Sequence, residues 1–146
     1  MASDYTFVEN SWGNSFYKFY NTRLNYDDAK AQCESDGSFM AFPRSQKENQ
    51  FLQDVLPNEW PYSTWIGIND IDQEGTFVGP DGNEISWTNW DGSEPNGHLW
   101  GPEHDEDGAI MSKGWGKWLD VKLSDLNQFI CSFDIEGNFF SLELND

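Results

Sequence analysis

A block of oxygen-bearing side chains in the second half of the chain could bind a hard metal ion. Between Lys47 and Lys113 the sequence has 14 aspartates and glutamates and no lysine or arginine. Carboxylate and amide oxygens are the ligands of calcium, which takes about six to eight of them. The candidates in and just after this block are Asp70, Asp72, Glu74, Glu94, Asn96, Glu103, Asp105, Glu106, Asp107 and Asp120. The pattern favours calcium, and a solvated acidic surface is the alternative that stays open.

The spacing of these residues excludes two other kinds of chemistry. No Asp-x-Asp-x-Asp-Gly loop is present, so the site is not an EF-hand and its ligands come from several loops. The chain also has no Gly-x-Ser-x-Gly motif and no phosphate-binding loop. A glycosidase would use paired carboxylates. The acidic residues of this chain instead gather with Asn96, and we expect no apolar setting that would raise the pKa of one of them. We therefore expect a binding protein and not an enzyme.

The overall charge limits the partners of the chain. With 26 acidic against 8 basic residues, the formal net charge of −18 repels nucleic acid and anionic membrane surfaces. No run of about 18 apolar residues is present, which argues against membrane insertion. Aromatic residues make up 16 % of the 146 residues, enough for the chain to bury a core and fold. We expect cations as partners, either metal ions or basic proteins.

Two helices are predicted in the first half of the chain. The first begins at Asn25 or Tyr26, has acids in its first turn, and is ended by Gly37. The second begins with a capping box, a serine at Ser45 followed three residues later by glutamate, and continues to about Leu56. Both helices precede the candidate ligands, which begin at Asp70.

Short strands are predicted around these helices. The turn signal Gly79-Pro80-Asp81-Gly82 predicts a hairpin that joins two strands. The predicted strands are residues 16–20, 65–68, 76–78, 85–87, 109–111, 117–118 and 129–131, and residues 135–146 could add an edge strand. Residues 88–108 have no periodicity, and a long irregular segment in a compact domain is usually functional.

Cys33 and Cys131 are the two cysteines of the chain. A bond between them would close a loop of about 100 residues and stabilise the fold by roughly 4–5 kcal/mol in the chain-entropy model. From counting alone, two buried free thiols are an equal alternative.

Four features together resemble the C-type lectin-like domain over about residues 16–133. Trp65-Ile66-Gly67-Ile68 is similar to the core strand motif of the family, and Glu94-Pro95-Asn96 is similar to its mannose-type sugar motif. Trp118-Leu119-Asp120 stands where the family has Trp-Asn-Asp, and Cys33 and Cys131 are similar to its outer disulfide. The resemblance implies the α+β C-type lectin fold, with two helices flanking antiparallel sheets and a long calcium-binding loop region. We expect one domain over 1–146, with its core at about 16–133 and a C-terminal extension at 134–146.

The resemblance also implies a calcium ion that binds sugar. Its protein ligands would be Glu94, Asn96, Glu106 and Asp120. In the family, the residues at Glu94 and Asn96 also hydrogen-bond two vicinal sugar hydroxyls, and the bond between Glu94 and Pro95 would be cis. Trp100 could stack on a sugar ring, with packing of the loop as the equal alternative.

A second, auxiliary calcium site is implied by the same resemblance. Asp70, Glu74 and Asp107 match it, with Glu106 shared between the two sites and Asp105 as a further candidate. This site would brace the long loop, and plain loop acids are the alternative.

Three positions depart from the family pattern. Gly108 and Leu123 stand where the cysteines of an inner disulfide would fall, so the loop region lacks that covalent connection. Leu119 replaces the asparagine of Trp-Asn-Asp and removes one oxygen ligand, which predicts weaker binding of calcium and sugar. Replacement of Leu119 by asparagine should strengthen calcium binding if the side chain points at the ion.

The function implied is a secreted, calcium-dependent lectin. Its partners would be glycans with equatorial vicinal hydroxyls, such as mannose, glucose, N-acetylglucosamine or fucose, whereas the galactose-type motif has glutamine and aspartate in place of Glu94 and Asn96. A homo-oligomer stays open. The alternative is a non-sugar domain of the same fold that binds a surface such as ice, mineral or a basic protein.

Overall fold

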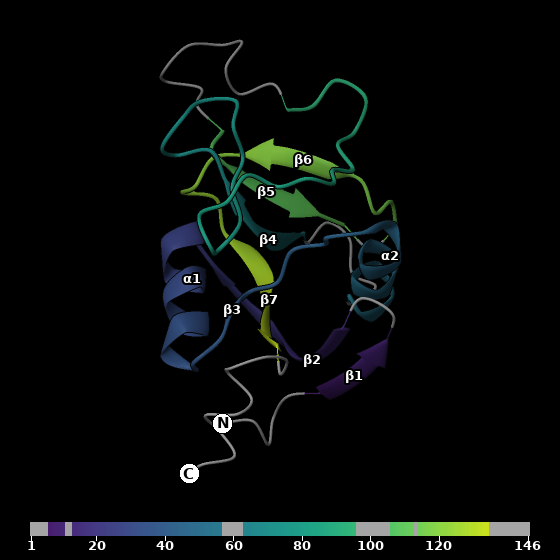
Figure 1. The fold of residues 1–146 in the computed structure, drawn as a ribbon. Coiled ribbons are helices and arrows are strands. Elements are labelled where there is room, and N and C mark those ends of the chain that lie inside the picture. The colour runs from purple at the N-terminus through teal and green to yellow at the C-terminus, as the bar shows by residue number, and fades with distance from the viewer. Residues whose placement is uncertain (1–5, 11–12, 57–62, 96–105, 113, 135–146) are drawn as a thin grey trace.

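Two helices and one mixed β-sheet form the computed structural model, which describes residues 6–10, 13–56, 63–95, 106–112 and 114–134. The helices are α1 (Tyr26–Ser35) and α2 (Gln46–Val55), and Figure 1 shows them at opposite flanks of the sheet. The strands are β1 (Thr6–Asn10), β2 (Gly13–Leu24), β3 (Phe39–Met40), β4 (Thr64–Asn69), β5 (Gly108–Met111), β6 (Trp118–Val121) and β7 (Asn127–Asp134). The predicted α+β class with two flanking helices is confirmed.

Local capping signals determine where both helices begin. Asn25 is the N-cap of α1, and its side chain accepts a hydrogen bond from the Asp28 amide at 2.8 Å. Ser45 is the N-cap of α2 and accepts from the Glu48 amide at 3.2 Å. Just after α1, Gly37 has a φ of +79°, in the left-handed region that favours glycine. Both helices therefore form where the sequence predicts them.

The capping-box glutamate has a different role from the predicted one. In a capping box, Glu48 would accept a hydrogen bond from the Ser45 amide. Here its carboxylate is buried and accepts from the Arg44 backbone at 3.0 Å, the Arg44 Nε at 2.9 Å and the Tyr17 hydroxyl at 2.9 Å. Because Tyr17 lies on β2, Glu48 connects α2 to the sheet.

The sheet has the order β1-β2-β7-β4-β5-β6, and β3 pairs with β7. Every pair is antiparallel except β4 with β7, which run parallel with Thr64 opposite Gln128 and Trp65 opposite Phe129. The sheet is therefore mostly antiparallel, as expected, with one parallel pair at its centre. The last strand enters the centre of the sheet between β2 and β4, and its direction is set by its antiparallel pairing with β2.

A disulfide between Cys33 and Cys131 joins α1 to this central strand β7. Both half-cystines are fully buried, and 98 residues separate them in the sequence. The equal alternative of two free thiols is thereby excluded, and the pairing implied by the resemblance is confirmed.

Alternating residues of β6 belong to different parts of the core. Trp118 is fully buried in one apolar cluster, where its ring meets those of Trp87 and Trp90 edge to face. Leu119, next in sequence, is half-buried and packs against a second cluster that contains Trp65. Because successive strand residues point to opposite faces, Trp118 and Asp120 share one face of β6, and Leu119 lies on the other.

The predicted hairpin strands at 76–78 and 85–87 do not form. The turn itself is present, with Gly79 N donating to Asn83 O at 3.0 Å. Val78 forms two isolated bridges, one to Asn69 at the end of β4 and one to Glu84. Ile85 N also donates to Phe77 O at 3.1 Å, so the two arms meet as a hairpin although neither forms a continuous strand.

Candidate calcium sites

Three carboxylates from separate segments converge beside β6. Asp120 comes from β6 itself, Glu106 lies two residues before β5, and Glu94 follows the segment that carries Trp90. One oxygen of each lies within 4.8 Å of the others, and the Asp120 side chain is buried. The first carboxylate group is therefore Glu94, Glu106 and Asp120.

Backbone hydrogen bonds hold the segment of Glu94 alongside β6. Asp91 N donates to Trp118 O at 2.9 Å, and Trp118 N donates to Asn89 O at 2.9 Å. Glu94 N then donates to Asp91 O at 2.8 Å, which turns the chain back toward the strand. The bond from Glu94 to Pro95 is cis, as the resemblance implies.

Contrary to the expectation from sequence, burial and repulsion between charges raise the pKa values of Glu94 and Glu106 in this first group. Burial, together with the neighbouring Asp120, raises the pKa of Glu94 to about 7. The pKa of Glu106 is raised by burial and then by the charges of Asp120 and Asp125. Three carboxylates held this close are stable in their ionised form when a cation lies between them.

A second carboxylate group lies where β4 ends and β5 begins, next to the first. Asp70 follows β4, Glu74 lies in the loop beyond it, and Asp107 precedes β5. One oxygen of each lies within 4.8 Å of the others, and Asp70 N donates to Asp107 O at 3.1 Å. Since β4 and β5 are paired, this backbone bond continues their contact into the two loops.

Asp70 of this second group has one carboxylate oxygen without a hydrogen-bond partner among the described residues. Asp70 Oδ2 accepts a hydrogen bond from Gly75 N at 2.9 Å. Asp70 Oδ1 is buried and has no hydrogen-bond partner among the described residues. Burial, with a contribution from Glu74, raises the pKa of Asp70 to about 6. A buried carboxylate oxygen that accepts no hydrogen bond is a position where a bound cation is expected.

Calcium fits both groups better than a transition metal. Every donor in them is a carboxylate oxygen, and neither contains sulfur or imidazole. Zinc and copper prefer sulfur and nitrogen ligands, whereas hard cations such as calcium prefer oxygen. The acidic residues grouped by the resemblance are therefore also grouped in space, with Glu106 in the first group.

The remaining predicted residues divide into two kinds. The candidates that lie outside the described residues are Asn96, Trp100, Glu103 and Asp105. Asp72 lies within the described residues, is exposed, and belongs to neither carboxylate group. Leu119 packs against the cluster of Trp65 and points away from the face of Asp120.

Asn49 is a positioning residue that the sequence analysis missed. Its side chain is buried and accepts a hydrogen bond from Trp118 Nε1 at 2.8 Å, while its Nδ2 donates to Gly116 O at 3.0 Å. Asn49 thereby fixes Trp118, two residues from Asp120, against α2. A buried polar residue on the sheet-facing side of an amphipathic helix is the only local signal of this role.

Comparison with known families decides the assignment. The family model of the lectin C-type domain matches residues 22–133. The chain belongs to the C-type lectin domain family. Human C-type lectin domain family 3 member A is 33 % identical over 113 residues, which are 76 % of this chain and 55 % of that protein. This C-type lectin domain therefore spans about half the length of that curated relative.

Solved structures share the fold. The carbohydrate-recognition domain of the mouse scavenger receptor C-type lectin has a TM-score of 0.76 and 28 % identity, over 90 % of this chain and 97 % of that one. A calcium-independent type II antifreeze protein has a TM-score of 0.72 with 18 % identity, over 88 % and 91 % of the two chains. The second likeness is one of fold alone. Within the described part of this C-type lectin domain, no helix is long and apolar enough to cross a bilayer.

Proposed function

We propose that this C-type lectin domain binds mannose-type sugars through calcium. The observation that carries the proposal is the convergence of Glu94, Glu106 and Asp120. The acidic residue of the Glu-Pro-Asn motif thus lies among carboxylates that are distant in sequence. The mouse scavenger receptor domain, which has the same fold, is named as a carbohydrate-recognition domain.

The first carboxylate group, together with Asn96, would hold the ion that contacts sugar. Calcium supplies open coordination positions that accept two vicinal hydroxyls. Glu94 would also accept a hydrogen bond from one hydroxyl, and Asn96 would donate one to the other. Equatorial hydroxyls, as in mannose, glucose, N-acetylglucosamine or the equivalent pair of fucose, fit this arrangement, and Trp100 is proposed to stack on the ring.

The second carboxylate group would hold a structural ion. Asp70, Glu74 and Asp107 come from the two loops that follow β4 and precede β5. An ion there would join these loops and would offer a partner to Asp70 Oδ1. Because Glu106 and Asp107 are adjacent, this ion would also restrain the first group.

Secretion is part of the proposal. The buried Cys33–Cys131 disulfide supports it, because disulfides form and persist in oxidising compartments. The acidic surface, with a net charge of −18, is compatible with millimolar extracellular calcium as the working condition.

Titration calorimetry with Glu94→Gln and Glu84→Gln tests the proposal. Both variants lose one negative charge, but Glu84 is exposed and belongs to neither carboxylate group. We expect Glu94→Gln to weaken calcium binding at least about tenfold and Glu84→Gln to leave it unchanged. Mannose should bind the wild-type domain in millimolar calcium, galactose should bind much more weakly, and excess chelator should abolish both signals.

Mannose binding that persists in chelator would contradict the proposal. Equal weakening of calcium binding by Glu94→Gln and Glu84→Gln would also contradict it, because calcium would then respond to the overall charge and not to this site. If no sugar binds while the domain adsorbs to calcite or ice, the surface-binding alternative replaces the lectin.

A further inference from the structure

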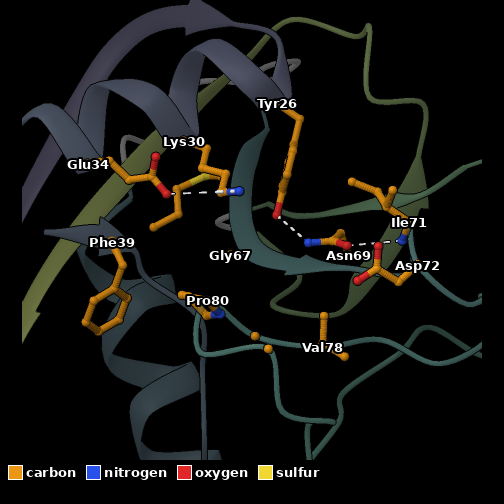
Figure 2. Close-up of a pocket in the computed structure, with 13 residues that line it drawn as sticks. Tyr26, Lys30, Glu34, Phe39, Gly67, Asn69, Ile71, Asp72, Val78 and Pro80 are labelled. Carbon is orange, nitrogen blue, oxygen red and sulfur yellow. Dashed lines mark hydrogen bonds and ion pairs between the residues drawn. The ribbon is translucent and has the colours of Figure 1, made fainter.

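A cavity of about 350 Å³ lies between α1 and the turn that follows Val78. Figure 2 shows Tyr26, Lys30 and Glu34 of α1 on one side of it and Val78 and Pro80 on the opposite side. None of the six residues of the two carboxylate groups lines it. The cavity is thus separate from the candidate calcium sites.

Two further hollows continue this cavity. One of about 340 Å³ shares Phe39 and Pro80 with it. Another of about 180 Å³ shares Phe42, Arg44 and Asp81 with the second. We call the three hollows together the α1 groove, since they follow one another from α1 to the turn at 79–82 and beyond. An elongated ligand fits this shape better than a compact one.

Apolar side chains are exposed along the α1 groove. Ile71 is 49 % exposed, one of four large hydrophobic residues so exposed in the described part of the chain. The half-buried rings of Phe39 and Phe42 line the successive hollows. Arg44 lies over the Phe42 ring at 5.7 Å, whereas no such cation contact is present at Phe39 within the described structure. Side chains of this kind are covered in a binding site by apolar or cationic groups.

The charge along the α1 groove is negative and uncompensated. Its two basic side chains are already paired, Lys30 with Glu34 at 4.0 Å and Arg44 with the buried Glu48 at 2.9 Å. The exposed carboxylates that remain in the lining are Asp72, Asp81 and Glu84. No lysine or arginine of the described residues forms an ion pair with these three. Cationic groups on a ligand would therefore find complementary charge.

We propose that the α1 groove binds an extended basic peptide segment of another protein, one with alternating basic and aliphatic side chains. An extended chain directs alternate side chains to opposite sides. Its aliphatic side chains enter the hollows beside Ile71 and Phe39, and its lysines or arginines reach Asp72, Asp81 and Glu84. This interaction does not use calcium and is independent of the proposed lectin function.

Fluorescence anisotropy in chelator and low salt tests the proposal with a labelled hexapeptide of alternating lysine and leucine. The variant Asp81→Asn with Glu84→Gln removes two groove charges, and Asp81→Asn keeps the acceptor that binds Asn83 N. Its matched control, Asp28→Asn with Asp54→Asn, removes two exposed charges elsewhere. We expect about fivefold weaker binding in the groove variant and little change in the control.

A second pair of variants tests the apolar contact without a change of charge. Ile71→Ser should weaken the hexapeptide several-fold, while Leu126→Ser, at a residue 57 % exposed outside the groove, should not. Equal weakening by groove and control variants would show only attraction to an acidic protein and would overturn the proposal. Equal binding of a hexapeptide with serine or glutamate in place of lysine would overturn it as well. All four variants keep both carboxylate groups, so calcium and mannose binding are measured separately.

Discussion

The Leu123 side chain occupies the space beside Gly108. A Cβ atom on Gly108 would lie 3.1 Å from Leu123 Cδ2 and 2.8 Å from Trp65 Cζ3. Gly108 and Leu123 are the two positions where the family resemblance places an inner disulfide. Here an apolar contact stands in its place, one residue from Asp107 of the second carboxylate group. Packing, and not a covalent bond, therefore holds this end of β5.

Gly108→Ala should destabilise the fold by about 1–3 kcal/mol, because the added methyl meets Trp65 and Leu123. The Trp65 ring is fully buried against Tyr26, at 5.4 Å between ring centroids, and has little room to move. Urea unfolding in chelator measures the change. Gly92→Ala is the control, since a Cβ there meets nothing within 4 Å and should cause no loss. Equal stability of the two variants would show that the β5 end adapts freely.

Loss of the disulfide should lower the free energy of unfolding by roughly 4–5 kcal/mol, because it closes a loop of about 100 residues in the unfolded chain. The double variant Cys33→Ala with Cys131→Ala, compared with wild type in denaturant, measures this. Since both half-cystines are fully buried, thiol labelling of native protein in mild reductant should be slow. Rapid labelling of the folded domain would contradict the observed burial.

Stability without calcium should rise as the pH falls from 8 to about 5. The folded state holds a proton on Glu94 with a pKa of about 7 and on Asp70 with a pKa of about 6, against ordinary values of 4.5 and 3.8. The folded state therefore takes up protons before the unfolded chain does, so acid favours folding in this window. Melting curves in chelator at several pH values measure the trend.

The effect of calcium should have the opposite dependence on pH. The ion needs ionised carboxylates, so its stabilisation should be largest near pH 8 and shrink toward pH 5. Glu94→Gln should flatten both trends, because Glu94 has the higher pKa of the two. A calcium effect that is constant over this range would contradict the assignment of the site to these carboxylates.

Leu119→Asn should destabilise the calcium-free domain by about 1–2 kcal/mol, since it places an amide against the apolar cluster of Trp65. The gain in calcium affinity expected from the sequence required a side chain directed at the ion, and Leu119 is directed at this cluster instead. Denaturant unfolding measures the loss of stability. Leu126→Asn, at a residue 57 % exposed, is the matched control and should change little. An unaltered stability of Leu119→Asn would show that Leu119 contributes no packing.

Short stretches of sequence were enough to predict where the helices begin and which family the chain resembles. Asn25 and Ser45 cap helices whose first backbone amides need acceptors, and that requirement is met within three residues along the chain. The motifs around Trp65, Glu94 and Trp118 likewise carry the family pattern in a few consecutive residues. Such signals can be read without knowledge of what lies across the sheet.

Only the tertiary structure decided which distant groups meet. The two-residue β3 exists because Met40 pairs with Cys131, and the hairpin turn at 79–82 is joined to β4 because Val78 also pairs with Asn69. Glu48, a cap by its spacing, is buried against Tyr17 because α2 packs on β2. Glu94 and Asp120 meet because backbone bonds hold residues 89–91 along β6. These contacts join residues far apart in sequence, and their free energy depends on the completed sheet and not on any local pattern.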